Sequence, residues 1–382
     1  MMVASMSRAL LADVADIVMG QSPPSDSYNG HAVGMPFLQG KAEFGTISPR
    51  PVKWCSDPKK TAEPGSVLLS VRAPVGDVNL ADQRYCIGRG LAALMPKPNL
   101  DGPYLFFYLQ TLQSWFNSQS SGSTFQSINA GVLRNLVLDL PPLAEQRRIA
   151  RILSAIQSAA EAVRTGTVCR RSVADSLADT VFAPYLDRTW KTHSLGDVTN
   201  QRQYGLSIKG GAAGSLPILR MTNLSRGVVT YENLQYVDMP TADAEGYVLR
   251  PGDILFNRTN SPDLVGRVGI VERSIPSVFA SYLIRVVCDE QVVLPEFLNA
   301  FLNWAPIQAR LRGMATRGVS QANISASTLA TVEVPVPALD AQLDVIRAWR
   351  AAQRAIEASL VEGEALTRVF KSAQAALFAG AA

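Results

Sequence analysis

Two periods of hydrophobic and polar positions alternate along this chain, and both halves show them in the same order. Apolar residues alternate with others in "LRNLVLDLP" (133–141) and "LATVEVPVP" (329–337), as they do in half-buried strands, and prolines end both segments. Pro-Gly turns lead into short apolar runs at "PGSVLLSV" (64–71) and "PGDILFNR" (251–258). The pattern predicts β-rich domains over about 8–140 and 192–336, each with short buried helices near 104–118 and 296–311.

After each proline break the apolar period changes to three or four, which predicts a long helix. The first begins in "LPPLAEQRRIARIL" (140–153) and the second in "VPVPALDAQLDVIRAW" (334–349). The predicted stripes are Ile149, Ile152, Ile156, Ala160, Val163, Thr167, Val173, Leu177 and Val181, then Ile346, Trp349, Ile356, Leu360, Phe370 and Leu377. Such near-heptad stripes favour two helices, each about 60 Å long, packed along each other as a spacer. The alternative is two helices of an ordinary bundle.

The chain repeats itself, which defines its organisation. Ile128, Leu133, Leu136, Leu138 and Pro141 fall on Ile324, Leu329, Val332, Val334 and Pro337 at a constant offset of 196, and Gly166 and Gly363 interrupt the two helices at similar depth. We therefore predict a tandem duplication of the α+β class, in which two β-rich domains are separated by two long helices packed as an antiparallel coiled coil. The predicted segments are 1–140 and 187–336 for the domains, and 141–186 and 337–382 for the helices.

Composition is consistent with a folded intracellular protein. Of 382 residues, 47% are hydrophobic and 18% charged, and the formal net charge of +4 mildly favours an anionic partner. The four cysteines lie far apart without a CxxC pair, which indicates reduced thiols. Asp13 and Asp16 interrupt any signal-peptide core, and no run of about 18 apolar residues occurs. We expect a cytoplasmic protein with no membrane contact.

Signatures of covalent chemistry are missing from the sequence. Two histidines, His31 and His193, leave little room for a catalytic triad or a metal site. No GxxxxGK[ST] phosphate loop is present, and the glycine-rich "KGGAAGS" (209–215) does not match a dinucleotide fingerprint. We expect no catalytic residues and no metal ligands, so an enzyme with an unrecognised site is the weakest hypothesis.

Arginine, lysine and amide residues gather in the loops that follow the predicted strands. Arginine can grip guanine and Asn or Gln adenine through two hydrogen bonds, while Lys, Ser and Thr suit phosphates. The DNA-binding candidates are Gln39, Lys41, Arg50, Arg72, Ser123, Thr124 and Gln126 in the first half, and Arg220, Asn223, Arg226, Asn257, Arg258, Asn260, Arg317 and Gln321 in the second, within a wider cluster that includes Lys53, Arg84, Arg89 and Arg267. Any single one of these can equally be a solvated loop residue.

Nearly the whole chain resembles the specificity subunits of type I restriction–modification enzymes. The resemblance rests on "LPPLAEQRRIARIL", on "PGSVLLSVRAPVG" and "PGDILFNR", and on "TFQSINAGVLRNLVLDLPP" (124–142). The second helix departs from the motif, because Ala341 stands where Glu145 stands in the first copy, with Gln342 matching Gln146.

The resemblance implies a non-catalytic subunit whose two target-recognition domains each bind one half of an interrupted duplex DNA site. The helix pair would set the separation of the halves and dock the methyltransferase subunits, expected to be two, with Glu145, Gln146, Ile149, Ile156, Ile346 and Trp349 as candidate partner-binding residues. Those subunits would bring S-adenosylmethionine, and a restriction–translocase subunit would bring ATP and Mg²⁺.

A second hypothesis is a non-catalytic protein–protein scaffold with two binding domains on a coiled-coil spacer, which the small net charge supports. Steep salt dependence of duplex binding separates it from the first, because neutralised phosphates release counterions.

Overall fold

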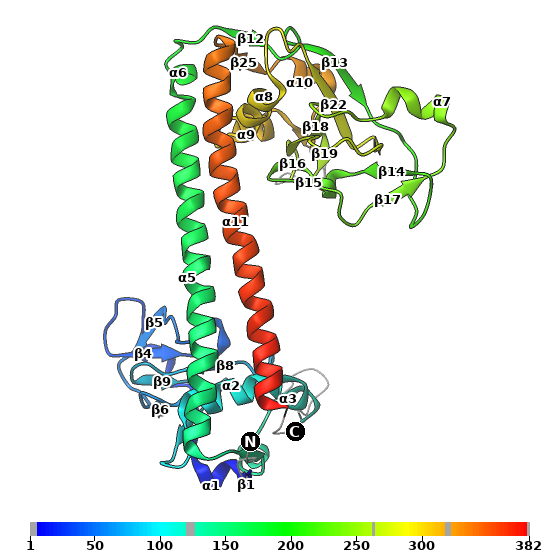
Figure 1. Cartoon of the computed structure of the whole chain (residues 1–382). Coiled ribbons are helices and arrows are strands. Elements are labelled where there is room, and N and C mark those ends of the chain that lie inside the picture. The colour runs from blue at the N-terminus through cyan, green and yellow to red at the C-terminus, as the bar shows by residue number, and fades with distance from the viewer. Residues whose placement is uncertain (1–5, 120–126, 262–263, 318–321, 380–382) are drawn as a thin grey trace. The chain divides into compact units, whose positions relative to one another are not determined.

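The computed structural model describes residues 6–119, 127–261, 264–317 and 322–379, and it confirms the predicted α+β class (Figure 1). The chain forms two compact units: unit 1 comprises residues 1–164 with 360–382, and unit 2 comprises 165–359. Helix α5 (Leu143–Val181) begins in unit 1 and ends in unit 2, and α11 (Leu339–Phe378) does the reverse. Both helices are thus divided between the units, so the predicted boundaries, which give each helix a segment of its own, stay a prediction.

The described residues of unit 1 form three sheets. Their strands are β1 (Ser7–Leu10), β2 (Ala15–Met19), β3 (Tyr28–Asn29), β4 (Met35–Leu38), β5 (Lys53–Cys55), β6 (Thr61–Ala62), β7 (Val67–Ser70), β8 (Val78–Leu80), β9 (Tyr85–Ile87), β10 (Leu91–Pro96) and β11 (Val137–Leu140). The sheet orders are β1-β11, β2-β10-β7-β8 and β3-β5-β4-β9-β6, in which only β4 and β9 pair in parallel among the described strands.

Short helices cover the core of unit 1: α1 (Leu11–Val14), α2 (Gly102–Thr111), α3 (Gln113–Gln119) and α4 (Ala130–Arg134). Helix α2 begins at Asp101 because its carboxylate accepts a hydrogen bond from the Tyr104 N–H at 3.0 Å, and α4 begins at Asn129 in the same way. The core extends to both ends of the chain, since Leu11 and Phe378 are buried in one cluster.

Unit 2 repeats this plan with longer loops. Its strands are β12 (Thr192–Ser194), β13 (Thr199–Tyr204), β14 (Leu216–Leu219), β15 (Leu224–Ser225), β16 (Gly227–Val229), β17 (Gln235–Val237), β18 (Ile254–Asn257), β19 (Thr259–Asn260), β20 (Val268–Ile270), β21 (Val278–Phe279), β22 (Leu283–Cys288), β23 (Thr316–Arg317), β24 (Ala322–Asn323) and β25 (Glu333–Pro335). The sheets are β12-β25, β13-β22-β18-β20-β16-β15, β17-β14-β21 and β19-β24-β23.

The helices of unit 2 besides the long pair are α6 (Ala183–Leu186), α7 (Thr241–Ala244), α8 (Pro295–Asn303), α9 (Ala305–Met314) and α10 (Ala326–Ala330). Its core is aromatic where α5 ends: the Phe182 ring stacks on Trp304 at 5.1 Å and meets the ring of Phe301 edge-on at 5.6 Å. The Trp304 indole N–H also donates to Asp179 of α5 at 2.7 Å. These contacts fix the end of α5 against α8 and α9.

The two units share their topology. The order β2-β10-β7-β8 corresponds to β13-β22-β18-β20, the pair β1-β11 to β12-β25, and the parallel pair β4-β9 to β14-β21. Equivalent backbone bonds occur in both units, because Leu11 N donates to Leu136 O and Leu195 N donates to Val332 O, and the two acceptors differ by the predicted offset of 196. This agreement in detail is what a tandem duplication produces.

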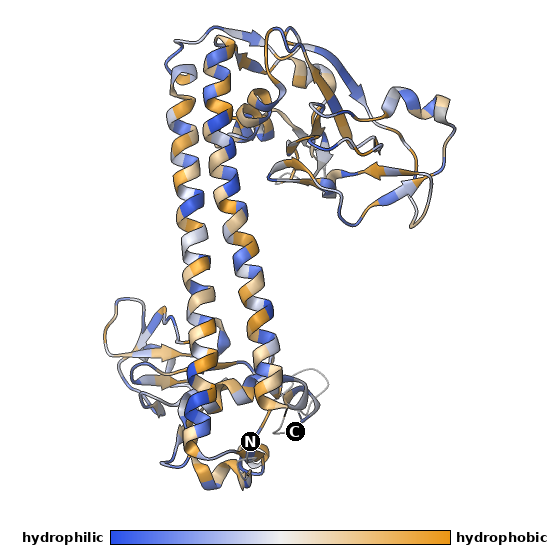
Figure 2. Cartoon of the chain, viewed as in Figure 1, coloured by the Kyte–Doolittle hydropathy of each residue, from blue (hydrophilic) through white to orange (hydrophobic). Residues whose placement is uncertain are grey.

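The two long helices pack against each other within each unit. In unit 1 a Cβ placed on Gly363 would lie 3.5 Å from Val163 Cγ1, and in unit 2 Thr167 contacts Ser359. Apolar residues recur along both helices (Figure 2). One member of the predicted stripe is wrong, because Val173 is 67% exposed and the smaller Ala174 and Ala178 are buried instead.

Within the described ranges, no helix combines the length and the apolar character that crossing a bilayer requires. Among the same residues, no three His, Cys, Asp or Glu side chains gather as the ligands of a metal ion would.

Candidate nucleic-acid interface

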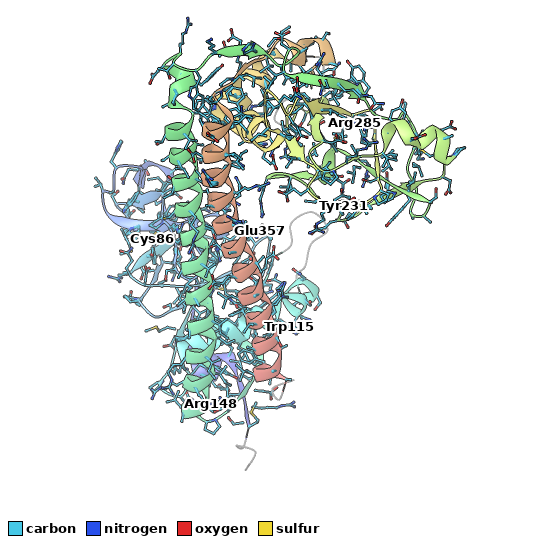
Figure 3. The ribbon with its side chains drawn as sticks, turned by 45° about the horizontal axis from the view of Figure 1, so that its top comes forward. Cys86, Trp115, Arg148, Tyr231, Arg285 and Glu357 are labelled. Carbon is cyan, nitrogen blue, oxygen red and sulfur yellow. The ribbon has the colours of Figure 1, made fainter. Side chains whose placement is uncertain are left out.

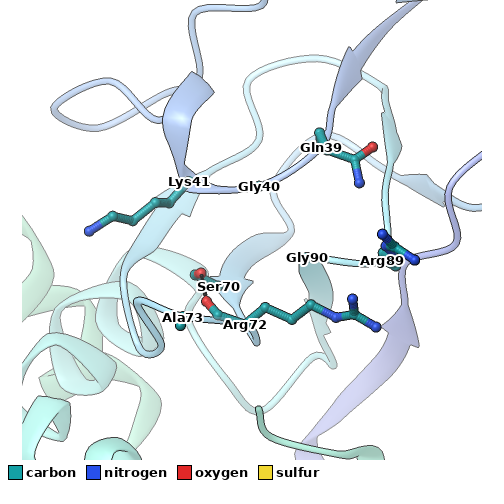
Figure 4. A pocket seen from close by; sticks show the side chains of 8 residues that line it. All are labelled: Gln39, Gly40, Lys41, Ser70, Arg72, Ala73, Arg89 and Gly90. Atoms are coloured by element: carbon teal, nitrogen blue, oxygen red, sulfur yellow. Dashed lines mark hydrogen bonds between the residues drawn. The ribbon is translucent and has the colours of Figure 1, made fainter. Parts of the chain in front are cut away.

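Three loops of unit 1 bring predicted residues together around two adjoining cavities. Gln39 follows β4, Arg72 follows β7, and Arg89 precedes β10. One cavity of about 260 Å³ is lined by Gln39, Gly40, Lys41, Ser70, Arg72, Ala73, Arg89 and Gly90 (Figure 4). The other, of about 520 Å³, is lined by Met19, Val71, Arg72, Ala73, Arg89, Ser127 and Ile128. Arg72 and Arg89 therefore line both.

Hydrogen bonds position the backbone at Arg72 and Arg89. Their guanidinium groups are available to a ligand. The Ser70 hydroxyl bonds to the carbonyls of Arg72 and Pro74 at 3.0 and 2.9 Å, which holds the turn after β7. Both arginine side chains are exposed, and no described residue accepts a hydrogen bond from either guanidinium group. In Figure 4 they and the Gln39 amide point toward one another, while Lys41 points away. This cluster can donate several hydrogen bonds to one anionic or acceptor-rich ligand.

The other candidates of unit 1 either have a partner, line neither cavity or lie outside the described residues. The Lys41 ammonium group pairs with Asp77 at 2.8 Å, so a phosphate would have to compete for it. Arg50 is exposed and lines neither cavity. Ser123, Thr124 and Gln126 lie outside the described residues.

In unit 2 several predicted residues have structural partners. Asn223 is buried, accepts a hydrogen bond from the Arg220 N–H at 3.0 Å and donates to Glu232 O at 2.9 Å. Asn257 is also buried and donates to Leu264 O at 3.1 Å. These two amides are the weakest candidates for a base contact, because a base cannot reach them without rearrangement. The guanidinium group of Arg220 donates to Asn233 O at 3.0 Å.

Arg258 of unit 2 occupies the backbone position of Val71, which lines the larger cavity of unit 1. Val71 N donates to Gly90 O, and Arg258 N donates to Tyr282 O, so Arg258 corresponds to Val71 and Tyr282 to Gly90. The next residues correspond too, since Arg72 bridges Ser127 and Thr259 pairs with Asn323. One backbone frame thus carries different polar side chains in the two units.

The Arg258 side chain packs against the ring of Tyr204. Its guanidinium carbon lies 4.9 Å from the centre of the Tyr204 ring, and one of its nitrogens donates to Ser281 O at 3.3 Å. Tyr204 and Tyr282 are both exposed large side chains. A guanidinium group stacked on an aromatic ring is a flat donor surface held at low entropic cost.

Asn260 and Arg317 are described by their strands alone, whereas Arg226 is described in full. Asn260 lies in β19 and Arg317 in β23, and both strands pair with β24 next to Arg258 and Thr259. Arg226 lies in the turn before β16 with a positive φ of 53° and is exposed. Gln321 lies outside the described residues.

The candidate partner-binding residues of the helices fall into two groups. Gln146, Ile149 and Ile346 are buried within their own units, which leaves them no surface for a partner, whereas Glu145, Ile156 and Trp349 are half-buried. The carboxylate of Glu145 pairs with Arg148 at 2.7 Å, and this ion pair lowers the pKa of Glu145 (Figure 3 labels Arg148). The large apolar side chains that the two helices expose are Val168, Val173, Leu339, Leu343, Val361 and Val369.

Gln146 and Gln342 have a role that the sequence did not reveal. The Gln146 amide accepts a hydrogen bond from Asp101 N at 2.9 Å and donates to Asn99 O and Pro141 O at 3.2 and 2.9 Å. Gln342 makes the same three bonds, to Leu294 N, Val292 O and Pro337 O, at 2.8, 2.9 and 2.9 Å. Each glutamine ties the start of a long helix to the loop before a domain helix. Tyr204 and Tyr282 were also missed, although aligning the two halves places Tyr282 opposite Gly90.

Comparison with known proteins agrees with this architecture. Residues 9–165 match the family described as type I restriction modification DNA specificity domain. The putative type I restriction enzyme MjaX specificity subunit of Methanocaldococcus jannaschii is 46% identical over 149 residues, 39% of this chain and 35% of that protein. The StySPI specificity subunit of Salmonella potsdam is 23% identical over 312 residues, 76% of this chain and 67% of that one.

The fold is also that of a solved structure. The crystal structure of a type I restriction-modification system S subunit from M. genitalium aligns with a TM-score of 0.68 at 16% identity, covering 99% of this chain and 97% of that one. The structure is therefore a duplicated α+β fold that includes two long helices. Over residues 9–165 the chain is similar to the DNA specificity domain of type I restriction–modification systems, and over nearly its whole length it has the fold of the solved S subunit. It aligns with 35% of MjaX and with 57% of the MjaIX subunit of the same organism.

Proposed function

We propose that the chain is the sequence-specific DNA-binding subunit of a type I restriction–modification complex, in which each unit binds one half of an interrupted duplex site. The observation that carries this proposal is the common backbone frame that presents Arg72 and Arg89 in unit 1 and Arg258 in unit 2. Guanidinium groups suit guanine O6 and N7 or backbone phosphates.

The two units would recognise different half-sites. Unit 1 offers two exposed arginines and the Gln39 amide, whereas unit 2 offers Arg258 beside two exposed tyrosines. Aromatic rings make apolar contact with base edges and methyl groups, which arginine does not. Because equivalent backbone positions carry different side chains in the two units, we expect the two halves of the DNA site to differ in sequence.

The complex would supply the chemistry that this chain is proposed to lack. We propose that two methyltransferase subunits dock on the helix pair with S-adenosylmethionine, and that restriction–translocase subunits bring ATP and Mg²⁺. The helix pair would set the length of the spacer between the half-sites. The relatives named above are subunits of type I restriction enzymes, which supports such partners. The proposed compartment is the cytoplasm, where this complex would meet duplex DNA.

The test begins by mapping methylated sites in cells with and without this chain, which identifies the cognate duplex. We expect Arg72→Ala with Arg89→Ala to weaken cognate binding by about 1–3 kcal/mol for each hydrogen-bonded base that an arginine no longer reaches. Arg8→Ala is the matched control, because Arg8 is an exposed arginine of unit 1 that pairs with Asp139 at 2.8 Å outside both cavities.

Binding is measured on cognate and random duplexes at several salt concentrations. Equal losses of affinity on both duplexes would assign the arginines to phosphates, with a shallower salt slope. Duplex binding without salt dependence, or no methylated site that depends on the chain, would refute the proposed function and support the scaffold.

A further inference from the structure

A tyrosine ring and a backbone carbonyl hold the Arg258 side chain of unit 2 in place. The guanidinium carbon lies 4.9 Å from the centre of the Tyr204 ring, and Nη1 donates to Ser281 O at 3.3 Å. The ring is itself fixed at its far end, because the Tyr204 hydroxyl accepts a hydrogen bond of 2.8 Å from Ala326 N at the start of α10. These contacts set the plane of the guanidinium group.

The outer edge of the Arg258 guanidinium group is open to a ligand. The side chain is half-buried, and no described residue accepts a hydrogen bond from Nη2. Arg285 of the same unit shows the contrast, because its Nη2 donates to two glutamine side chains and a backbone carbonyl at distances between 2.6 and 3.2 Å. Nε is buried without a partner in both arginines, so they differ in this outer edge. Arg285 is used by the fold, whereas Arg258 keeps donors that the fold does not use.

The duplication supplies an internal comparison for the pair of Tyr204 and Arg258. Met19 is followed by a glycine whose N–H bonds to the first residue of β10, and Tyr204 by a glycine whose N–H bonds to the first residue of β22. Tyr204 therefore corresponds to Met19, as Arg258 corresponds to Val71. Met19 and Val71 line the cavity of about 520 Å³ in unit 1. The tyrosine and the arginine thus occur together in unit 2, and both are replaced in unit 1, as expected of two side chains that act as one element.

Two acceptors that lie side by side match the open edge of Arg258. Guanine O6 and N7 offer such a pair, and so does a phosphate group. The surroundings favour the base, because Tyr204 and Tyr282 are 42% and 47% exposed and Tyr282 O accepts a hydrogen bond from Arg258 N. Aromatic rings beside the donors offer apolar contact to a base, whereas a phosphate gains nothing from them. A planar donor fork held in one orientation also suits acceptors that lie in the fixed plane of a base.

We propose that Arg258 reads one guanine in the half-site bound by unit 2, and that Tyr204 is the positioning residue that holds the guanidinium plane for it. This inference rests on the proposed function and names the base that one of its residues recognises. Arg258 would donate from Nη1 and Nη2 to O6 and N7, and Tyr204 would act only through Arg258.

The base contact is tested with the complex of the full chain and its methyltransferase subunits, on cognate duplexes in which each guanine is replaced singly by 7-deazaguanine. This base has a C–H group in place of N7 and lacks one of the two acceptors. We expect one guanine at which the replacement weakens binding of the natural chain by about fivefold or more. Arg258→Ala should lose at least as much affinity for the unmodified duplex and be insensitive to the replacement at that guanine.

A lysine variant separates a base contact from a phosphate contact. Arg258→Lys keeps the charge but loses the planar fork, so it should behave like Arg258→Ala at that guanine. Equal losses of Arg258→Ala on cognate and random duplexes, with Arg258→Lys close to the natural chain, would assign the arginine to a phosphate and overturn the inference.

The positioning role of Tyr204 is tested by a double-mutant cycle. Tyr204→Leu should reduce discrimination at the same guanine by about threefold or more, the scale of a cation–π contact at an exposed site. In the Arg258→Ala background it should have no further effect, whereas additive losses would contradict a role through Arg258. Tyr204→Phe keeps the ring and should retain most of the discrimination; a loss as large as that of Tyr204→Leu would contradict the ring as the positioning group.

The matched control is Arg310→Ala, at an exposed arginine of unit 2 that pairs with Glu333 at 3.3 Å. It should leave the sensitivity to every 7-deazaguanine unchanged, and a change equal to that of Arg258→Ala would contradict the assignment. If Arg258→Ala fails to fold by circular dichroism, Arg258→Lys decides the question. A cognate duplex without a guanine that behaves as described would refute this inference alone. Absence of any cognate duplex would refute the proposed function, and this inference with it.

Discussion

Replacing Gln146 with leucine is expected to lower the free energy of unfolding of unit 1 substantially. The buried amide makes three hydrogen bonds, and leucine has a similar volume but no polar atom, so Asp101 N and the carbonyls of Asn99 and Pro141 are all left without this partner. An unsatisfied buried group costs about 1–3 kcal/mol. With the two carbonyls partly rehydrated, we expect a loss of about 2–4 kcal/mol in total.

The assay is urea unfolding followed by circular dichroism on the full chain. Gln342→Leu removes the equivalent three bonds and should lower the free energy of unfolding of unit 2 by a similar amount. Gln146→Leu should therefore lower the urea midpoint of unit 1, and Gln342→Leu that of unit 2. Gln83→Leu, at an exposed glutamine of unit 1, serves as the control with little change. A loss below about 0.5 kcal/mol in Gln146→Leu lies within the range of ordinary surface substitutions. It would refute the stabilising role of the three Gln146 hydrogen bonds.

Two further predictions concern glycines and thiols. Gly20→Ala and Gly205→Ala should each destabilise by more than about 1 kcal/mol, because the new Cβ would lie 2.1 Å from Gly88 O and 2.3 Å from Ala280 O; Gly30→Ala, where nothing lies within 4 Å, should change the urea midpoint little. In the native protein at pH 8 a disulfide reagent should react rapidly at Cys169 alone, since the other three thiols are buried and burial raises the pKa of both Cys86 and Cys288 to about 12. Rapid reaction in Cys169→Ser would contradict this.

The architecture was predictable because the duplication and the hydrophobic periodicity can be recognised from the order of residue types along the chain. The proline breaks, the Pro-Gly turns and the constant offset each reflect one structural rule, and the fold class they predicted is confirmed. The prediction of which α5 residues face the partner helix was less accurate, because it chose Val173 and omitted Ala174 and Ala178. Hydropathy ranks Val173 above Ala174 and Ala178, but closely approaching helices need small side chains at their contact.

The site was less predictable because a loop residue's role depends on contacts distant in sequence. Asn223 and Arg258 both lie in loop-like sequence. In the structure, however, Asn223 is buried and donates to Glu232 O, whereas Arg258 stacks on Tyr204. Gln146 was assigned to partner binding for the same reason, because its real contacts lie 45 or more residues away or across a proline. The base-contacting residues themselves remain a prediction.

The last turns of the chain complete the core of the first domain. Phe378 lies 5.4 Å from the Tyr104 ring and 5.6 Å from Tyr108, Phe370 lies 5.9 Å from Phe107, and Gln374 donates to Phe107 O at 3.1 Å. Unit 1 can therefore close around α2 only after α11 has been synthesised as far as Phe378. A stop codon upstream of position 370 would leave this part of α2 open to water and expose the truncated product to proteolysis.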